Sequence, residues 1–197
     1  MQSCETKRIQ PYYLDIETCG TGDRVNPSTD LIITIQYQPL DLETGLPLGD
    51  LTILKSWESS EETIVKEFFN RFYRPGIYRD NFVPVGFSLH FEFEALLSKF
   101  KKYNLGSVSC RDMYYDRKYV DIKPIIVLIN NGSFEGAKLN YYTDKPSDGS
   151  AIKEYYEKHE YDKIEDYIKT ETASFLALLQ KITKNIGEFG ITRKILD

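Results

Sequence analysis

The sequence has few of the residues on which several common kinds of active site depend. Its 197 residues include only three cysteines, Cys4, Cys19 and Cys110, which are scattered and form no Cys-x-x-Cys pair. This pattern argues against a disulfide framework and against a zinc cage, and it favours a reducing, intracellular setting. Only two histidines occur, His90 and His159. A histidine-based zinc enzyme and a Ser-His-Asp triad are therefore disfavoured.

Long apolar runs and a net positive charge are also missing. No stretch approaches the roughly 20 apolar residues that a membrane-spanning helix needs. The N-terminal sequence MQSCETKRIQ lacks the apolar segment of a signal peptide. We therefore expect a cytoplasmic protein that does not enter the membrane. The net charge of −5 gives no overall basic field, so binding to nucleic acid would require a local basic patch.

Carboxylates, in contrast, are abundant. The chain has 30 Asp and Glu residues, which keeps open a site for Mg²⁺ or Mn²⁺, because these hard cations prefer oxygen ligands. The length and the 41% of hydrophobic residues suit one domain. We expect that domain to span residues 1–197, with a core over about 8–186.

The first third of the chain predicts an antiparallel meander. Residues 10–16, 31–38 and 51–57 have the composition of strands, and turn residues such as Gly45 and Gly49 lie between the second and the third. Short connections of this kind favour antiparallel pairing.

Helices and strands alternate in the rest of the chain. A helix is expected to begin at Ser59, which forms a capping box with Glu62. The other expected elements are a buried strand over 81–87, a helix from about 91, a strand near 107–111 or 117–121, a helix over 122–130, a loop over 143–150 and helices over about 152–186. This order predicts an α/β fold whose mixed sheet has three antiparallel and two parallel strands and is flanked by helices.

Two carboxylates stand on one face of the first expected strand. In YYLDIETCG, residues 12–20, side chains alternate, so Tyr13, Asp15 and Glu17 point the same way. Asp and Glu are depleted in strands. This face is therefore either exposed to water or directed at something positive.

A further carboxylate interrupts the apolar stripe of the C-terminal helix. Glu171 fills the gap between Ile168 and Phe175, and Tyr167 lies one turn earlier near the same face. An inward carboxylate is costly unless it is paired or bound to a metal. The alternative is that Glu171 stands at the edge of the stripe and reaches water.

Glu92 follows the expected strand that ends in Gly86. Ligands of open α/β sheets bind near such strand ends, although an acidic residue is also ordinary in a first helical turn. Two hard cations about 4 Å apart can hold a phosphate, activate water and stabilise a leaving oxygen. Asp15, Glu17, Glu92 and Glu171 would supply the carboxylates of such a site. Tyr167, with a pKa near 10, would position the water.

Three motifs occur in a characteristic order, LDIET (14–18), GFSLHFEFEAL (86–96) and YIKTETASFLALL (167–179). In this respect the chain resembles the tyrosine-containing branch of the DEDD superfamily of 3′–5′ exonucleases. That branch includes the proofreading domains of family B DNA polymerases and stand-alone predicted exonucleases. The resemblance implies a ribonuclease H-like fold and two Mg²⁺ or Mn²⁺ ions. It assigns metal binding and catalysis to Asp15, Glu17, Glu92 and Glu171, and a catalytic role to Tyr167.

The sequence departs from the pattern at three positions. Ser88 stands where Asn is usual, and Glu92 and Glu171 stand where Asp is usual. Each Glu shifts its carboxylate by about 1 Å, whereas catalytic sites tolerate roughly 0.5 Å. One reading is an active exonuclease for single-stranded DNA or RNA ends, in DNA repair or beside a polymerase. The alternatives are a weakly active or inactive nucleic-acid-binding relative, and a structural or partner-binding domain.

Several residues near the motifs are candidates for contacts with nucleic acid. The segments 70–80 and 109–119 interleave basic and aromatic residues, which suits phosphate contacts and base stacking, although such mixtures also occur on ordinary surfaces. His90 has the alternative role of an ordinary helix-start residue, and Asp121 that of a helix N-cap. The predicted nucleic-acid-binding residues are Thr18, Phe87, Ser88, His90, Phe91, Arg111, Arg117 and Lys118.

Overall fold

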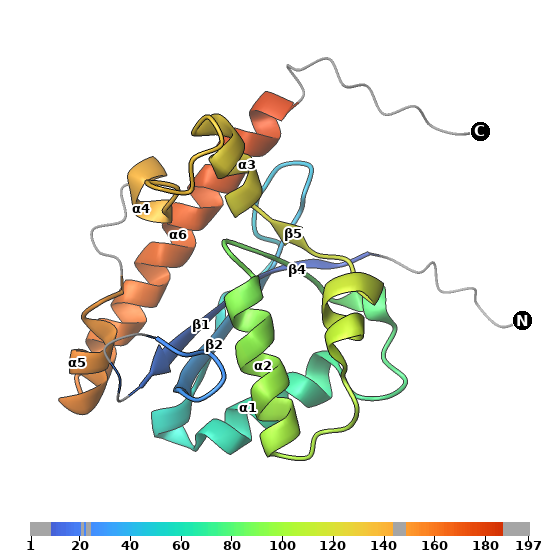
Figure 1. Ribbon diagram of the computed structural model, residues 1–197, viewed down its shortest axis with the longest axis vertical. Helices are drawn as coiled ribbons and strands as arrows, with labels where there is room; N and C mark the ends of the chain where they lie inside the picture. The colour runs from blue at the N-terminus through green and yellow to red at the C-terminus, as the bar shows by residue number, and fades with distance from the viewer. Residues whose placement is uncertain (1–8, 21, 23–24, 144–148, 187–197) are drawn as a thin grey trace, which may run out of the picture.

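The centre of the fold is a mixed sheet of five strands (Figure 1). A computed structural model describes residues 9–20, 22, 25–143 and 149–186. The strands are β1 (Pro11–Cys19), β2 (Leu31–Pro39), β3 (Thr52–Lys55), β4 (Val83–Gly86) and β5 (Val120–Asp121). Their spatial order is β3-β2-β1-β4-β5. β2 is antiparallel to β1 and β3, and β4 is parallel to β1 and β5.

This topology confirms the predicted α/β fold with a mixed sheet. The antiparallel half is the meander of β1, β2 and β3. β1 also belongs to the parallel half, since it pairs with β4 along its other edge. The parallel half therefore has three strands, β1, β4 and β5, and β1 lies at the junction.

Helices cover both faces of the sheet. On one face, α1 (Glu61–Phe72) and α2 (His90–Lys102) bury Leu14 and Ile16 of β1 in an apolar core. On the other, α6 (Tyr161–Ile186) packs on Tyr13, whose ring centroid is 5.0 Å from that of Phe175. Figure 1 shows α6 running along one side of the sheet and α1 with α2 on the other. The shorter α-helices are α3 (Lys123–Ile129), α4 (Leu139–Tyr142) and α5 (Ile152–Glu157).

Several element boundaries differ from the prediction. A 3-10 turn, η1 (Ser56–Glu58), ends the third strand early, so the N-cap of α1 is Ser60 and the predicted cap at Ser59 is wrong. The Ser60 hydroxyl accepts a hydrogen bond from the backbone N–H of Thr63 at 3.1 Å. Of the two positions proposed for the last strand, β5 forms within 117–121. The loop expected over 143–150 lies mostly outside the described residues.

The pairing of β1 with β2 has one irregularity. Glu17 is paired with Thr34, but Thr18 is paired with Ile32, so Ile33 is an extra residue on β2. Such a β-bulge redirects side chains. Ile33 consequently packs beneath α6 with Ile164, instead of on the α1 face.

Gly86, the last residue of β4, allows β4 to lie close to β1. A Cβ atom at this position would lie 2.8 Å from the backbone oxygen of Leu14 and 2.5 Å from Leu89 Cδ2. The Leu14 oxygen belongs to the central strand and cannot move freely. We therefore expect Gly86→Ala to lower the free energy of unfolding by about 1–3 kcal/mol. Urea denaturation measures this loss. An unchanged denaturation midpoint would contradict this account of the close contact.

No helix in the described part of the chain has both the length and the apolar sequence that crossing a membrane would require.

Candidate active site

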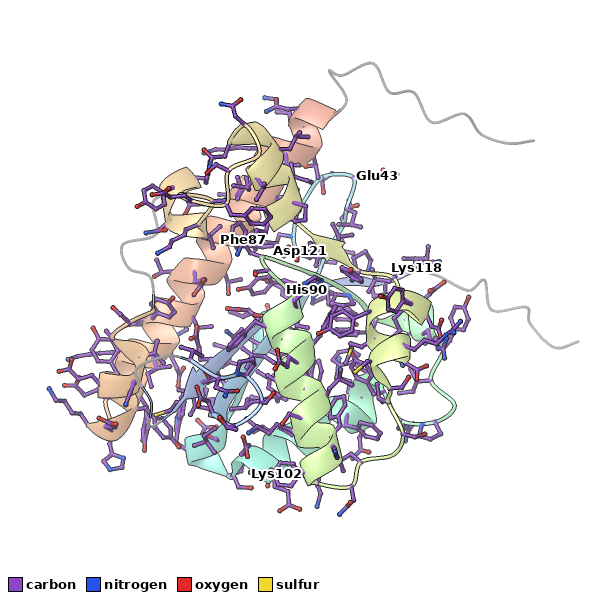
Figure 2. The ribbon with its side chains drawn as sticks, viewed as in Figure 1. Glu43, Phe87, His90, Lys102, Lys118 and Asp121 are labelled. Carbon is purple, nitrogen blue, oxygen red and sulfur yellow. The ribbon has the colours of Figure 1, made fainter. Side chains whose placement is uncertain are left out.

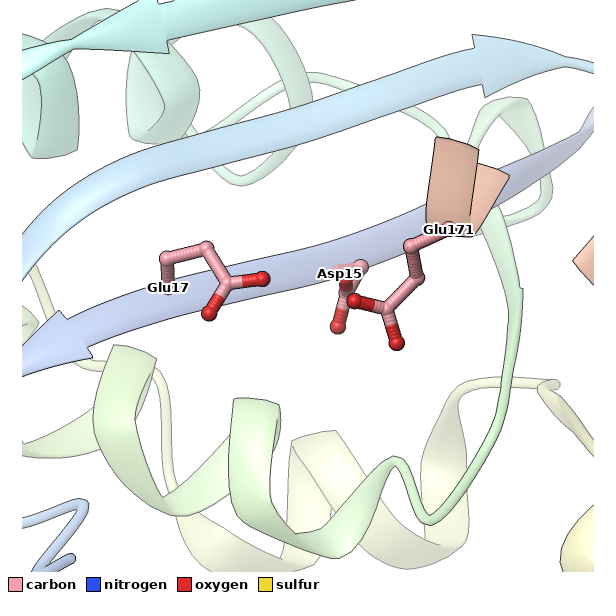
Figure 3. Close-up of side chains that lie close together, drawn as sticks. All are labelled: Asp15, Glu17 and Glu171. Carbon is pink, nitrogen blue, oxygen red and sulfur yellow. The ribbon is translucent and has the colours of Figure 1, made fainter. Parts of the chain in front are cut away.

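Three carboxylates from distant parts of the sequence meet on the α6 side of the sheet. Asp15 and Glu17 project from β1, and Glu171 projects from α6 (Figure 3). One carboxylate oxygen from each residue lies within 4.8 Å of those of the other two. The alternation along β1 gives Asp15 and Glu17 the same face, and the gap in the α6 stripe turns Glu171 toward them. The structure thus brings together three of the four carboxylates selected from the sequence.

Glu92, the fourth, lies in the first turn of α2 beside Asp15 and is only 5% exposed. Burial, followed by the charge of Asp15, raises the pKa of Glu92 well above its ordinary value. Its Oε2 atom is buried and has no hydrogen-bond partner among the described residues. A divalent cation would supply that partner and offset the repulsion between the carboxylates. Because all the donors are oxygen atoms, the set fits Mg²⁺ or Mn²⁺.

Tyr167 is held beside the same carboxylates. Burial, and then the charges of Glu17 and Glu171, raise the pKa of its phenol above the ordinary value. Tyr167 therefore keeps its proton at neutral pH and can donate a hydrogen bond. Gly149 lies against it, since a Cβ there would be 3.0 Å from the Tyr167 hydroxyl oxygen.

These side chains line one open cleft of about 680 Å³. All five predicted catalytic residues border it: Asp15, Glu17, Glu92, Tyr167 and Glu171. So do four of the predicted nucleic-acid-binding residues: Thr18, Phe87, Ser88 and Phe91. Phenylalanine rings and hydroxyl groups thus border the acidic centre, a combination that could accommodate bases and phosphates.

Other residues of the cleft were not predicted from the sequence. Asp30, Ser150 and Lys153 also line it, and Lys153 is the one basic residue among the described lining residues. Lys153 belongs to the helical lead-in to the third motif, where nothing in the local pattern distinguishes it from other exposed lysines. Its position depends on how α5 packs beside the cleft.

The other predicted nucleic-acid-binding residues do not line this cleft. His90 is exposed at the start of α2, with its ring centroid 5.4 Å from that of Tyr114. Figure 2 shows Lys118 on the side of α2 away from α6. Arg111 forms an ion pair with Asp116 at 3.5 Å, and Lys118 forms one with Asp80 at 2.8 Å.

Arg117 is placed differently again. Its guanidinium lies over the Tyr73 ring, 4.4 Å from the centroid, and it lines a separate pocket of about 210 Å³. Burial lowers the pKa of Arg117. The segment 112–116 forms one π-helical turn, η3 (Asp112–Asp116), which lies between Arg111 and Arg117 and which composition did not predict.

Asp121 supports the loop that carries Ser88. Its carboxylate accepts hydrogen bonds from the backbone N–H groups of Ser88 at 2.8 Å, Leu89 at 3.1 Å and Lys123 at 3.0 Å. Asp121 therefore stabilises the starts of α2 and α3. Ser88 has a left-handed backbone with φ of 69°, a conformation in which Asn is enriched. Asn is also the usual residue at the corresponding position of the second exonuclease motif.

The fold and the site define a class: an α/β protein whose mixed sheet carries an acidic cleft suited to divalent cations. Solved structures of exonuclease I are similar to this chain. One match is E. coli exonuclease I in complex with a dT13 oligonucleotide, with a TM-score of 0.62 and 12% identity, covering 93% of this chain and 43% of that one. A second is the E. coli enzyme in complex with a 5cy-dA13 oligonucleotide, with a TM-score of 0.51 and 13% identity, covering 68% and 35%.

A third match is an ExoI/SSB-Ct complex, with a TM-score of 0.50 and 13% identity, covering 68% of this chain and 35% of that one. At such identities the likeness concerns the fold alone, so the chain shares its fold with part of these exonuclease I structures. It spans less than half the length of these structures. No protein-family model matches the sequence, and no curated protein matches it.

Proposed function

We propose that the chain is a metal-dependent 3′–5′ exonuclease that hydrolyses phosphodiester bonds at the ends of single-stranded nucleic acid. The observation that carries this proposal is the convergence of Asp15, Glu17 and Glu171 within 4.8 Å. Beside them lies the buried Oε2 of Glu92, which has no hydrogen-bond partner in the part of the chain that the structure describes. The exonuclease fold supports the proposal, as do the oligonucleotides bound in two of the similar structures. An action beside a polymerase or a repair complex belongs to the same proposal and rests on the motif resemblance. An action in the cytoplasm also belongs to it and rests on the scattered cysteines and the N-terminal sequence.

The five predicted catalytic residues of the cleft have chemical roles in this proposal. Asp15, Glu17, Glu92 and Glu171 would hold two Mg²⁺ or Mn²⁺ ions, which when bound polarise the phosphate and activate water. Tyr167 donates its hydroxyl proton in a hydrogen bond that orients the water. Although Glu171 is one methylene longer than the Asp of the motif, its carboxylate reaches Asp15 and Glu17.

The strand would enter beside the aromatic residues of the cleft. Phe87 and Phe91 offer faces on which a terminal base can stack, and Thr18 and Ser88 offer hydroxyl groups for phosphate oxygens. His90, Arg111, Arg117 and Lys118 lie outside the cleft, so a role for them requires nucleotides upstream of the 3′ end.

The test is cleavage of a 5′-labelled 20-nucleotide DNA and an RNA of the same sequence. With Mg²⁺ or Mn²⁺ we expect a ladder of products that shorten from the 3′ end, and with a chelator we expect none. A strand with phosphorothioate linkages at its 3′ end is the control for direction and should be degraded slowly. Intact strands with both ions would contradict the proposal.

A nucleic-acid-binding protein with little or no activity is the alternative, favoured by Glu at positions 92 and 171. It predicts binding of the same strands without turnover and with no effect of the chelator. Its affinity should fall as salt rises, because phosphate contacts release counterions.

A further inference from the structure

β2 has polar side chains at every second position of its buried part. Thr34 and Gln36 are 0% exposed and Gln38 is 9% exposed. A buried polar group without a hydrogen bond destabilises the fold, so the partners of these side chains indicate why they are present. Thr34 lies opposite Glu17 and Gln36 lies opposite Asp15 across the two strands.

The Gln36 side chain connects two of these polar groups to the acidic cleft. Its Nε2 donates a hydrogen bond to Asp15 Oδ2 at 2.9 Å, and its Oε1 accepts one from Thr34 Oγ1 at 2.9 Å. An ionised carboxylate only accepts hydrogen bonds, so Asp15 selects the NH₂ group of Gln36, and the amide oxygen is left to accept from the Thr34 hydroxyl. Both ends of the buried amide are thereby satisfied.

Asp15 Oδ2 accepts a second hydrogen bond from a residue of its own strand, Tyr13, two positions earlier. The hydroxyl of Tyr13 donates to the same oxygen at 3.2 Å, and Tyr13 is 2% exposed beneath α6. Two buried donors therefore converge on one oxygen of a carboxylate that also faces Glu17, Glu171 and Glu92. Fixed donors of this kind stabilise an anion among like charges and restrict its rotation.

We propose that Gln36 and Tyr13 are positioning residues for the cation site. They hold the Asp15 carboxylate in the orientation in which it meets Glu17 and Glu171, so that the oxygen ligands are assembled before a divalent cation binds. The inference rests on the proposed function for the nature of the ligand, a divalent cation, and does not depend on turnover.

The test is the affinity of the full chain for Mn²⁺ without nucleic acid, measured by calorimetry. Gln36→Leu and Tyr13→Phe should each weaken binding by about 10- to 100-fold, as is typical when the partner of a metal ligand is removed. Gln38→Leu is the matched control. Gln38 lies on the same strand and is also buried, but its amide donates to the backbone oxygen of Gly49 at 2.8 Å. Its loss should leave the affinity for Mn²⁺ unchanged.

Thermal unfolding in chelator separates loss of positioning from loss of fold. If Gln36→Leu does not fold, Tyr13→Phe carries the test, because it removes a single oxygen atom. Affinity equal to the wild type in both variants, or an equal loss in Gln38→Leu, would overturn the inference.

Failure of this inference can be told apart from failure of the proposed function. Suppose that the wild type binds Mn²⁺ but cleaves no strand, and that both variants bind Mn²⁺ more weakly. This result would contradict the proposed exonuclease activity and support the positioning role. If the wild type cleaves strands and both variants keep full affinity for Mn²⁺, only the positioning role is contradicted.

Discussion

Asp15→Asn is expected to reduce the cleavage of single strands by about 1000-fold. Asp15 lies near the other three carboxylates, since it meets Glu17 and Glu171 and also adjoins Glu92. The substitution keeps the shape of the side chain but removes its charge, and with it several kcal/mol of stabilisation by bound cations. About 4 kcal/mol corresponds to three orders of magnitude in rate. The measurement is the initial rate on a labelled strand at saturating Mn²⁺.

Stability distinguishes this effect from misfolding. Without metal, Asp15→Asn removes a charge from a cluster of like charges, so the chelated variant should unfold at a higher temperature than the wild type. Asp166→Asn is the control, because Asp166 is an exposed carboxylate on α6 whose side chain is 81% accessible. That variant should keep both activity and stability. Full activity in Asp15→Asn would contradict a two-cation site centred on this residue.

Glu61→Gln is expected to have the largest effect on stability. Glu61 Oε1 lies 3.1 Å from Lys99 Nζ and accepts a hydrogen bond from the backbone N–H of Ile32 at 2.7 Å. The side chains of Lys99 and Glu61 are 2% and 4% accessible. Removing one partner of a buried ion pair leaves the other charge uncompensated and costs about 3–5 kcal/mol. Equilibrium denaturation in urea at neutral pH measures the loss.

The effect of Glu61→Gln should depend on pH in a defined direction. Burial alone would raise the pKa of Glu61, but hydrogen bonds from Lys102, Tyr103, the Ile32 backbone and Lys99 lower it below the ordinary value. A group with a lowered pKa stabilises the fold at higher pH and loses that contribution as the pH falls through its folded pKa. The difference between wild type and variant should therefore be full at neutral pH and shrink below about pH 4.

Lys102→Met provides the comparison for Glu61→Gln. Lys102 also pairs with Glu61, at 2.7 Å, but its side chain is 53% accessible. Exposed ion pairs contribute about 0–1 kcal/mol, so this variant should unfold close to the wild type. Equal losses in the two variants would contradict a dominant role for the buried Glu61–Lys99 pair.

Asp15, Glu17 and Glu171 were predictable because each one breaks a periodic pattern. Asp15 and Glu17 occupy strand positions that acidic residues avoid, and Glu171 interrupts an apolar stripe. Gln36 was also within reach, since Thr34, Gln36 and Gln38 alternate with apolar residues. The composition of this strand, rich in β-branched residues, masked that signal.

Other features depend on geometry that local sequence does not encode. The extra residue Ile33 is defined only by the register between β1 and β2. Arg111 and Lys118 have the composition expected of a phosphate-binding patch, but away from the cleft Arg111 pairs with Asp116 of η3 and Lys118 pairs with Asp80. Lys153 resembles any surface lysine until α5 is packed beside β1. Long-range packing decides these positions.

The bulge at Ile33 separates polar from apolar surroundings along the carboxylate cluster. After the bulge, Thr34 and Gln36 form a polar floor beneath Asp15. At the bulge, Ile33 packs in a buried apolar cluster with Ile152, and Ile152 gives the cleft an apolar lining there. Charges attract more strongly where the surroundings are less polarisable. The two ends of the carboxylate cluster should therefore differ in their attraction for cations, so that two ions in this cleft would bind with unequal affinities.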